Sequence, residues 1–325
     1  MKKLSIVIPT LNRYEYLRRT IEVFLPQIKR NIENIQFVVC ANCCNDNTDT
    51  YMKNLCKENT FIEYYYYNQY AEVGESIIRS VEKCTSEYVI IWGDDDLPYP
   101  FLIDYLLNTL NEQETIGIIH INRLYGKDTI YGIKDLGVKN TQYESMTLQI
   151  TLPQLIDRFT IDLGFISSIV FRLDAWNKGK NYFSPSHYGY EFLAIILMGT
   201  KKLEAKTSCL YINLPMEIQR NPLNRDFSAK WPLYMFVGVP NMMSDFDKWG
   251  ISEGAYKAWC KNKRPKLLGY IWNMAYTSID RSFYKTKCRE LNKYQQSKFR
   301  RILTYIIVYT FPKNIFKFIK GKLYS

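Results

Sequence analysis

The chain has 325 residues, 47% hydrophobic and 15% aromatic, and is therefore long enough to bury one large core with an appendage. Its eight cysteines lack regular spacing and no signal peptide is apparent, so we expect reduced thiols in a cytoplasmic protein, without a disulfide framework or a zinc cluster at Cys40, Cys43 and Cys44. The formal charge of +11 is concentrated in residues 285–325, which argues against the basic groove of a nucleic-acid-binding protein, and no nucleic-acid partner is expected.

The first 125 residues alternate between short apolar runs and segments whose apolar residues stand three to four apart. The runs predict strands and the spaced segments predict helices. The predicted strands cover residues 4–9, 36–40, 61–67 and 88–91, and the predicted helices cover residues 14–28, 48–58 and 72–84. This alternation predicts a parallel sheet with helices on both faces and ligands at the carboxyl ends of its strands.

The pattern becomes less regular in the rest of the chain. Further strands are predicted at residues 116–124, 165–171 and 203–212, and further helices at residues 152–159 and 191–198. Residues 213–225 contain two prolines, Arg220 and Arg225 in polar company, which predicts a mobile loop. From about residue 226 the pattern is helical to the end.

The most informative motif follows the fourth predicted strand, where Asp94, Asp95 and Asp96 stand directly before Leu97 and Pro98. Three adjacent carboxylates repel one another, so their place at a strand end indicates a neutralising cation. Mg²⁺ and Mn²⁺ prefer oxygen ligands, commonly one or two carboxylates with phosphate oxygens and water. The alternative is a solvated acidic turn in which an aspartate caps the next helix.

Three ordered segments, residues 6–13 (IVIPTLNR), 38–48 (VVCANCCNDNT) and 87–96 (EYVIIWGDDD), resemble the nucleotide-binding half of a family 2 glycosyltransferase. The resemblance implies a GT-A fold, an α/β architecture in which helices sandwich a Rossmann-like, mostly parallel sheet, with a helical C-terminal region here. It also implies a nucleoside-diphosphate sugar donor, with a UDP-sugar favoured. A divalent Mn²⁺ or Mg²⁺ ion and inversion at the anomeric carbon complete what it implies.

The resemblance also suggests how the chain is divided. Residues 1–225 are expected to form the GT-A catalytic domain, with a nucleotide-sugar-binding half at 1–125 and an acceptor-side half at 126–225. Residues 226–325 are expected to form a helical extension that ends in a basic, amphipathic tail.

The triplet of aspartates leaves two registers for the metal ligand. In the family, the metal aspartate is the last residue of an Asp-x-Asp motif or its equivalent. Anchoring the alignment on Leu97 selects Asp95, whereas the literal Asp94-x-Asp96 pattern selects Asp96. Asp94 is then expected on the ribose or base side.

Pro9, Thr10, Asn12 and Arg13 follow the first predicted strand. The resemblance places them beside the base and ribose of the donor. A proline that ends the strand, followed by Thr10 or Asn12 as the cap of the next helix, would explain the same residues.

The second motif departs from the family at Ala41, where an aspartate that pairs with the base is common. Asn42 and Asp46 are the nearest polar groups. Asn42 is therefore expected to contact the donor, and Asp46 to cap the helix that follows.

An inverting transferase needs a general base that takes the proton of the acceptor hydroxyl. By resemblance this base is a carboxylate at the start of a helix well beyond the metal site, and Glu191 lies 95 residues after Asp96. His187, one helical turn earlier, could share a face with Glu191 and is the alternative catalytic residue. His120, inside a strand pattern, is interpreted as structural.

Arg220 and Arg225 are candidates for a loop that closes over the donor diphosphate, because arginine pairs well with phosphate. Solvated loop charges are the alternative.

The C-terminal tail, residues 285–325, holds eleven Lys and Arg and one acid. Its apolar residues 302–311 are fewer than the ~20 that a membrane-spanning helix needs. Residues 313–323 place apolar side chains partly on one helical face among lysines, which predicts an interfacial helix on an anionic membrane surface. A terminal helix that packs on its own domain is the alternative.

Together these patterns predict a cytoplasmic glycosyltransferase, peripheral on the inner face of the cell membrane. Its acceptor would be a glycan or a lipid-linked oligosaccharide of a surface polysaccharide. A catalytically inactive GT-A partner subunit is one alternative. A sugar nucleotidyltransferase is another, although its glycine-rich triphosphate loop is not found, since no glycine precedes Gly74.

Overall fold

A computed structural model describes residues 1–113, 115–129, 132–138, 147–203, 207–220, 234–252, 254–257, 285, 288–289, 292 and 297–309. Contacts within the chain divide it into two units. The first comprises residues 1–183 and 191–223, and the second comprises residues 184–190 and 224–325.

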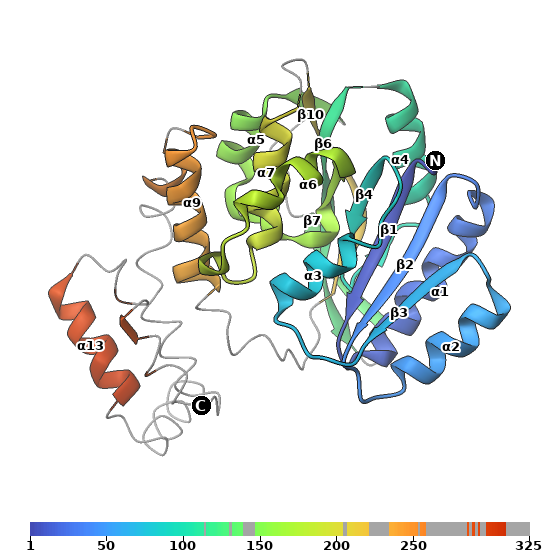
Figure 1. Cartoon of the computed structure of the whole chain (residues 1–325), viewed down its shortest axis with the longest axis horizontal. Coiled ribbons are helices and arrows are strands. Elements are labelled where there is room, and N and C mark those ends of the chain that lie inside the picture. The colour runs from blue at the N-terminus through green and yellow to red at the C-terminus, as the bar shows by residue number, and fades with distance from the viewer. Residues whose placement is uncertain are drawn as a thin grey trace. The chain divides into compact units, whose positions relative to one another are not determined.

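Over its described residues, the first unit is built on a ten-stranded sheet with the order β3-β2-β1-β4-β9-β6-β10-β5, with β7 paired to β6 and β8 paired to β10. The neighbouring strands β3, β2, β1 and β4 can be followed in Figure 1. The strands are β1 (Leu4–Thr10), β2 (Ile35–Asn42), β3 (Ile62–Tyr67), β4 (Tyr88–Ile91), β5 (Leu97–Pro98), β6 (Ile116–Thr129), β7 (Gly132–Val138), β8 (Thr147–Ile150), β9 (Ile169–Arg172) and β10 (Ser208–Gln219).

The direction of the strands changes halfway across this sheet. Strands β3, β2, β1 and β4 are parallel, as the sequence predicts for the first half. Strand β9 runs antiparallel to both of its neighbours, β4 and β6, and β10 is again parallel to β6. The predicted α/β architecture is confirmed. The sheet is mixed rather than mostly parallel, because β5, β7, β8 and β9 each run antiparallel to the strands they pair with.

Helices pack on both faces of the sheet. The helices of the first unit are α1 (Tyr14–Arg30), α2 (Thr48–Glu58), α3 (Val73–Val81), α4 (Leu102–Glu112), α5 (Leu152–Phe159), α6 (Leu173–Gly179) and α7 (Glu191–Lys201). Apolar residues of α1, α2 and α4 form one core with alternate residues of the strands, such as Ile6 and Ile8 of β1. Because neighbouring strand residues point to opposite faces, this alternation leaves the other face for further helices, and α3 contacts β1, β2 and α7.

Trp92, the residue before the Gly93-Asp94 step, is fully buried. Its ring lies edge-on to Phe24 of α1, with ring centroids 5.0 Å apart. The indole therefore anchors the end of β4 in the core.

Two segments differ from the sequence-based expectation. Residues 166–168 form a 3₁₀ turn rather than the start of a strand, because the Ser168 amide donates to the Phe165 carbonyl. The predicted mobile loop at 213–225 is wrong as far as Gln219, because these residues continue β10 beside β6 and β5. Pro215 is accommodated at a register shift of β10, where a proline does not interrupt the ladder.

The regular secondary structure described in the second unit is helical, as predicted for residues from about 226 onward. It contains the 3₁₀ turn Pro185–His187, a π-helical turn at Tyr234–Gly238, and the helices α9 (Val239–Lys248) and α13 (Lys298–Tyr309). Arg225 and the predicted interfacial helix at 313–323 lie outside the described residues. Among the helices that are described, none combines the length and the apolarity needed to cross a bilayer.

Candidate functional site

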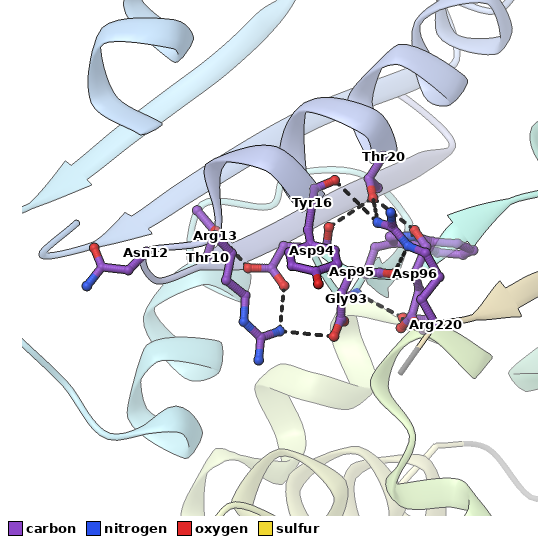
Figure 2. A network of polar contacts seen from close by, with 12 residues as sticks. Thr10, Asn12, Arg13, Tyr16, Thr20, Gly93, Asp94, Asp95, Asp96 and Arg220 are labelled. Carbon is purple, nitrogen blue, oxygen red and sulfur yellow. Dashed lines mark hydrogen bonds and ion pairs between the residues drawn. The ribbon is translucent and has the colours of Figure 1, made fainter. Parts of the chain in front are cut away.

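The three aspartates lie beside the end of β1, because β1 and β4 are parallel neighbours whose carboxyl ends meet (Figure 2). The Thr10 hydroxyl donates to Asp94 Oδ2 at 2.7 Å. Arg13 Nη1 donates to Asp94 Oδ1 and to Asp95 Oδ2, both at 3.0 Å. The structure therefore brings together the first and third sequence motifs, which are about 80 residues apart in the chain.

The three carboxyl groups differ in burial, and burial raises the pKa values of Asp94 and Asp96. Burial raises the pKa of Asp94 to about 6 despite the neighbouring Arg13 guanidinium, and the charge of Asp95 adds to the rise. Burial and the charge of Asp95 raise the pKa of Asp96 well above its ordinary value. The Asp95 side chain is the most accessible of the three, 16% exposed. Without a cation, the folded site therefore favours the protonated forms of Asp94 and Asp96.

Asp96 is held in place by Ser167 and by close packing against Gly93, neither of which the sequence singled out. Ser167 Oγ donates to Asp96 Oδ2 at 2.6 Å and accepts from the Gly93 amide at 2.8 Å. A Cβ at Gly93 would lie 2.6 Å from Asp96 Oδ2, so the close approach requires glycine. Nothing in the local sequence distinguishes Ser167, because only the fold brings it to β4.

Arg220 fixes the main chain of the turn formed by Asp94, Asp95 and Asp96. It follows β10 and is 2% exposed. Its Nε donates to the main-chain carbonyl of Asp95, and its Nη2 donates to Thr20 Oγ1 at 3.0 Å and to the Tyr16 carbonyl at 3.3 Å (Figure 2). The interpretation of Arg220 as a solvated loop charge is therefore wrong. Its contact with a diphosphate stays a prediction.

The second motif links two loops rather than presenting a free amide. Asn42 Nδ2 donates to the Ala71 carbonyl at 2.8 Å, and Asn42 Oδ1 accepts from the Ala71 amide at 3.0 Å and from Arg79. These contacts tie the end of β2 to the loop before α3. Any contact between Asn42 and the donor stays a prediction.

Asp46 joins the first two helices. Its Oδ2 accepts from the Tyr14 amide at 2.9 Å and its Oδ1 from the Thr48 amide at 3.0 Å. The prediction that Asp46 caps the following helix is confirmed. The alternative that Thr10 or Asn12 caps α1 is wrong. The N-cap residue of α1 is Arg13, whose side chain makes no capping hydrogen bond, and the Tyr14 amide donates to Asp46 instead.

Asn12 shapes the loop after β1. It has a left-handed φ of 53°, a region that asparagine tolerates. Its Oδ1 accepts from the Asn45 amide at 2.7 Å, which binds the first motif to the second.

Glu191 and His187 do not share a helical face. Glu191 is the first residue of α7, whereas His187 ends a 3₁₀ turn, and Tyr188 and Gly189 between them have left-handed φ values of 40° and 80°. The predicted common face is therefore wrong, since the helix does not extend back to His187. Glu191 is buried, and its carboxylate lies against Gly74 in the first turn of α3, where a Cβ would be 2.1 Å from Oε2.

His187 is fully buried within the second unit. Its Nε2 lies 3.0 Å from Asp245 Oδ2, and its ring lies edge-on to Trp249. Burial lowers the pKa of His187 despite the Asp245 carboxylate. The imidazole is therefore neutral near pH 7, and a catalytic role for it stays a prediction.

His120 is fully buried on β6, in keeping with the structural role assigned to it. Its Nδ1 lies 3.2 Å from the Ser168 carbonyl, and its ring packs on Phe159 and Tyr211.

Two buried charges that the sequence analysis missed lie next to this site. Glu217 on β10 and Arg123 on β6 are register partners, and both are at least 97% buried. Burial raises the pKa of Glu217 well above its ordinary value, and the charge of Asp96 adds to this. An acid between Met216 and Ile218 in an apolar strand would have been the sequence signal.

The carboxylates present fit a divalent cation that the donor helps to bind. Within the described part of the chain, no three or more Asp, Glu, His or Cys side chains are close enough to enclose a metal. Mg²⁺ and Mn²⁺ in phosphate-transfer and related sites need only one or two carboxylates, because phosphate oxygens and water complete the shell. Asp95, accessible beside two buried carboxyl groups, meets this requirement.

Comparisons with known proteins agree on the family. The family described as Glycosyl transferase family 2 matches residues 5–165. An uncharacterized glycosyltransferase of Rickettsia typhi is 29% identical over 119 residues, 35% of this chain and 34% of the relative. The GalNAc(5)-diNAcBac-PP-undecaprenol beta-1,3-glucosyltransferase of Campylobacter jejuni is 25% identical over 122 residues, 37% of each chain. The chain thus spans little more than a third of these curated relatives.

Solved structures share the fold over nearly the whole chain. The crystal structure of S. aureus TarS 1-349 in complex with UDP-GlcNAc has a TM-score of 0.61 and 10% sequence identity. The alignment covers 97% of this chain and 91% of that one. At this identity the likeness supports the GT-A fold.

Proposed function

The chain belongs to glycosyltransferase family 2 through residues 5–165, and we propose that it transfers a sugar from a nucleoside-diphosphate sugar to an acceptor hydroxyl with inversion. The observation that carries the proposal is the cluster of Thr10, Arg13 and the three aspartates where β1 and β4 end. In open α/β sheets, ligands bind outside the carboxyl ends of parallel strands. The UDP-GlcNAc complex of the structurally similar TarS supports a UDP-sugar donor.

The site residues divide the work of holding the donor. Arg13 partly neutralises Asp94 and Asp95, and Arg220 fixes the main chain of Asp95. Asp95 and the neighbouring Asp96 would hold a divalent cation, which when bound neutralises charge on the diphosphate leaving group. Glu191 is proposed to accept the proton of the attacking hydroxyl.

A donor screen tests this function. Binding of UDP-, GDP- and dTDP-sugars is measured by thermal shift with Mn²⁺ or Mg²⁺, and hydrolysis or transfer is followed by NMR, which also reports the anomeric configuration of the product. We expect a UDP-sugar to bind only with a divalent ion. The Asp95→Asn variant should lose this binding, whereas Glu191→Gln should bind the donor and not transfer the sugar.

Each other outcome has a defined meaning. Failure of every nucleotide sugar to bind with either metal contradicts the proposal. Binding without hydrolysis or transfer by the unaltered protein favours the inactive partner subunit. Formation of a nucleotide sugar from a sugar phosphate and a nucleoside triphosphate favours the nucleotidyltransferase.

We further propose that the acceptor is lipid-linked and that α13 helps the protein to reach it. The undecaprenol-linked substrate named for the Campylobacter relative supports such an acceptor. In α13, Phe299, Ile302, Tyr305, Ile306 and Tyr309 are between 41 and 71% exposed. They occupy one side of the helix, whereas Thr304 and Val308 on the other side are buried.

The charge of α13 favours an anionic bilayer as the partner of this apolar face. Lys298, Arg300 and Arg301 accompany it, and residues 298–309 contain no acid. Basic helices with exposed aromatic and aliphatic residues lie in the interface of anionic membranes. This would place the protein on the cytoplasmic face of the membrane.

Co-sedimentation with phosphatidylglycerol vesicles tests the membrane proposal. Replacing Phe299 and Ile302 with serine should reduce binding at least tenfold, because both apolar anchors are lost. Phe183→Ser, which alters a similarly exposed aromatic residue of the first unit, is the control and should bind normally. Equal binding by the α13 variant and the control would remove α13 from the proposal.

A further inference from the structure

Glu217 is a buried carboxyl group beside the proposed donor site, and the described part of the chain offers it no hydrogen bond. Its side chain is fully buried, and among the described residues neither carboxylate oxygen accepts a hydrogen bond. A buried charge without a partner is strongly unfavourable, and even a protonated carboxyl group would leave a donor and an acceptor unsatisfied. A group other than the described residues is therefore expected next to Glu217.

Arg123 does not supply the missing interaction, although it is the register partner of Glu217 on β6. Its Nε donates to Gln219 Oε1 at 2.9 Å, and its Nη2 pairs with Asp162 Oδ1 at 3.3 Å. Its Nη1 is buried and, within the described residues, has no hydrogen-bond partner. Two neighbouring buried groups of opposite charge thus each keep atoms without a hydrogen-bond partner among the described residues, which indicates that a further group binds here.

The position of Glu217 connects it to Asp96. On β5, Pro98 is the antiparallel register partner of Glu217, and Leu97 is that of Ile218. Asp96 is the residue immediately before β5, two positions from Pro98. The two buried carboxyl groups therefore belong to neighbouring segments two residues apart in register, and the charge of Asp96 acts on Glu217.

The charges around this point are not balanced. Asp94, Asp95, Asp96, Asp162 and Glu217 provide five carboxylates, and Arg13, Arg123 and Arg220 provide three guanidiniums, all linked by the contacts described above. With every group ionised the formal charge is −2. One divalent cation neutralises this charge and replaces the protons that burial favours on Asp96 and Glu217, whereas an anion would be repelled.

We propose that Glu217, together with Asp96, is a carboxylate ligand of the divalent cation of this site. The inference rests on the proposed function, which supplies the cation. It adds Glu217 of β10 as a ligand beside the aspartates that follow β4. A hard cation with oxygen ligands suits two carboxylates, with donor phosphate and water completing the shell. It would also give the unpaired Glu217 oxygens a partner.

Titration of the metal-free protein with Mn²⁺ alone, followed by electron paramagnetic resonance, tests the assignment without a sugar donor. Glu217→Gln keeps the shape of the side chain and should weaken Mn²⁺ binding at least tenfold. Glu82→Gln, the same change at an exposed site, is the control and should bind Mn²⁺ normally. Equal Mn²⁺ affinity in Glu217→Gln and the unaltered protein overturns the proposal.

Two further measurements separate the possible failures. Crystals of the unaltered protein soaked in MnCl₂ should show an anomalous peak in contact with Asp96 and Glu217, and a peak on Asp95 alone overturns the proposal even where Glu217→Gln does not fold. Metal-dependent UDP-sugar binding that is the same in Glu217→Gln and the unaltered protein rejects the ligand and leaves the proposed function standing. Absence of both Mn²⁺ and donor binding rejects both.

Discussion

Ser167 shows how one side chain can organise a charged turn. Its hydroxyl group both donates to the Asp96 carboxylate and accepts from the Gly93 amide, so one small side chain satisfies two buried groups. Neither group has access to water to replace the lost bond, since Asp96 is 3% exposed. The position of Asp96 therefore depends on a residue 71 positions away in the sequence.

Substituting Ser167 should test this dependence. Ser167→Ala should lower the free energy of unfolding by about 1–3 kcal/mol, the cost of leaving buried polar groups unsatisfied. It should also weaken Mn²⁺ and UDP-sugar binding, measured by calorimetry, because Asp96 is no longer held. Ser168→Ala removes a hydroxyl that donates to the Phe165 carbonyl and makes no bond to the aspartates, and should leave ligand binding unchanged. Equal loss of binding in both variants would contradict a specific role for Ser167.

Helices α6 and α7 pack at backbone contact because each contributes a glycine. A Cβ at Gly199 of α7 would lie 1.7 Å from the Ala175 carbonyl oxygen, and one at Gly179 would lie 1.9 Å from the Ile195 carbonyl oxygen. Nearly all of α7 is buried, and its first residue is Glu191. The close packing of this pair thus determines where the proposed general base is held.

Gly199→Ala should separate the two helices. The added methyl group meets backbone that cannot rotate away, so we expect a loss of about 1–3 kcal/mol in the free energy of unfolding, measured by urea denaturation. Because α7 carries Glu191, sugar transfer should fall more than donor binding. Lys201→Ala, at an exposed position of the same helix, is the control and should stay within about 0.5 kcal/mol of the unaltered protein. A fully stable Gly199→Ala protein would show that the helices can move apart at little cost.

The molecule as a whole places its two histidines, His120 and His187, in buried positions, one in each unit. Burial, together with the nearby Arg123 charge, lowers the pKa of His120 to about 3. The unfolded chain binds a proton near pH 6.5, whereas folded His120 does not. The stability that this neutral histidine contributes is therefore complete above pH 6.5 and is lost progressively as the pH falls toward 3.

The pH dependence of unfolding measures this contribution. The difference in unfolding free energy between the unaltered protein and His120→Phe should change by about 1.4 kcal/mol per pH unit below pH 6. Phenylalanine suits a position packed on Phe159 and Tyr211 and cannot titrate. Comparing the two proteins removes the contribution of the buried carboxyl groups, whose raised pKa values act in the opposite direction. Parallel pH profiles would show that His120 is protonated in the folded protein.

Much of the first half of this protein could be predicted from local pattern alone. The strand and helix positions from β1 to β4 follow from apolar runs and helical spacing, and the parallel order of those strands brings Thr10 and Arg13 to the aspartates. These features depend on neighbouring residues and on a regular topology, which a sequence pattern records directly.

Other features depend on contacts between distant segments. Four such features are the antiparallel direction of β9, the Ser167 hydroxyl that supports Asp96, the buried Arg220, and Glu217, for which the described residues offer no hydrogen bond. They involve segments around β9 and β10 that the sheet brings to the aspartates. A strand pattern shows which residues can be buried, whereas the partners of a buried charge are set by the register between strands, and that register exists only in the folded chain.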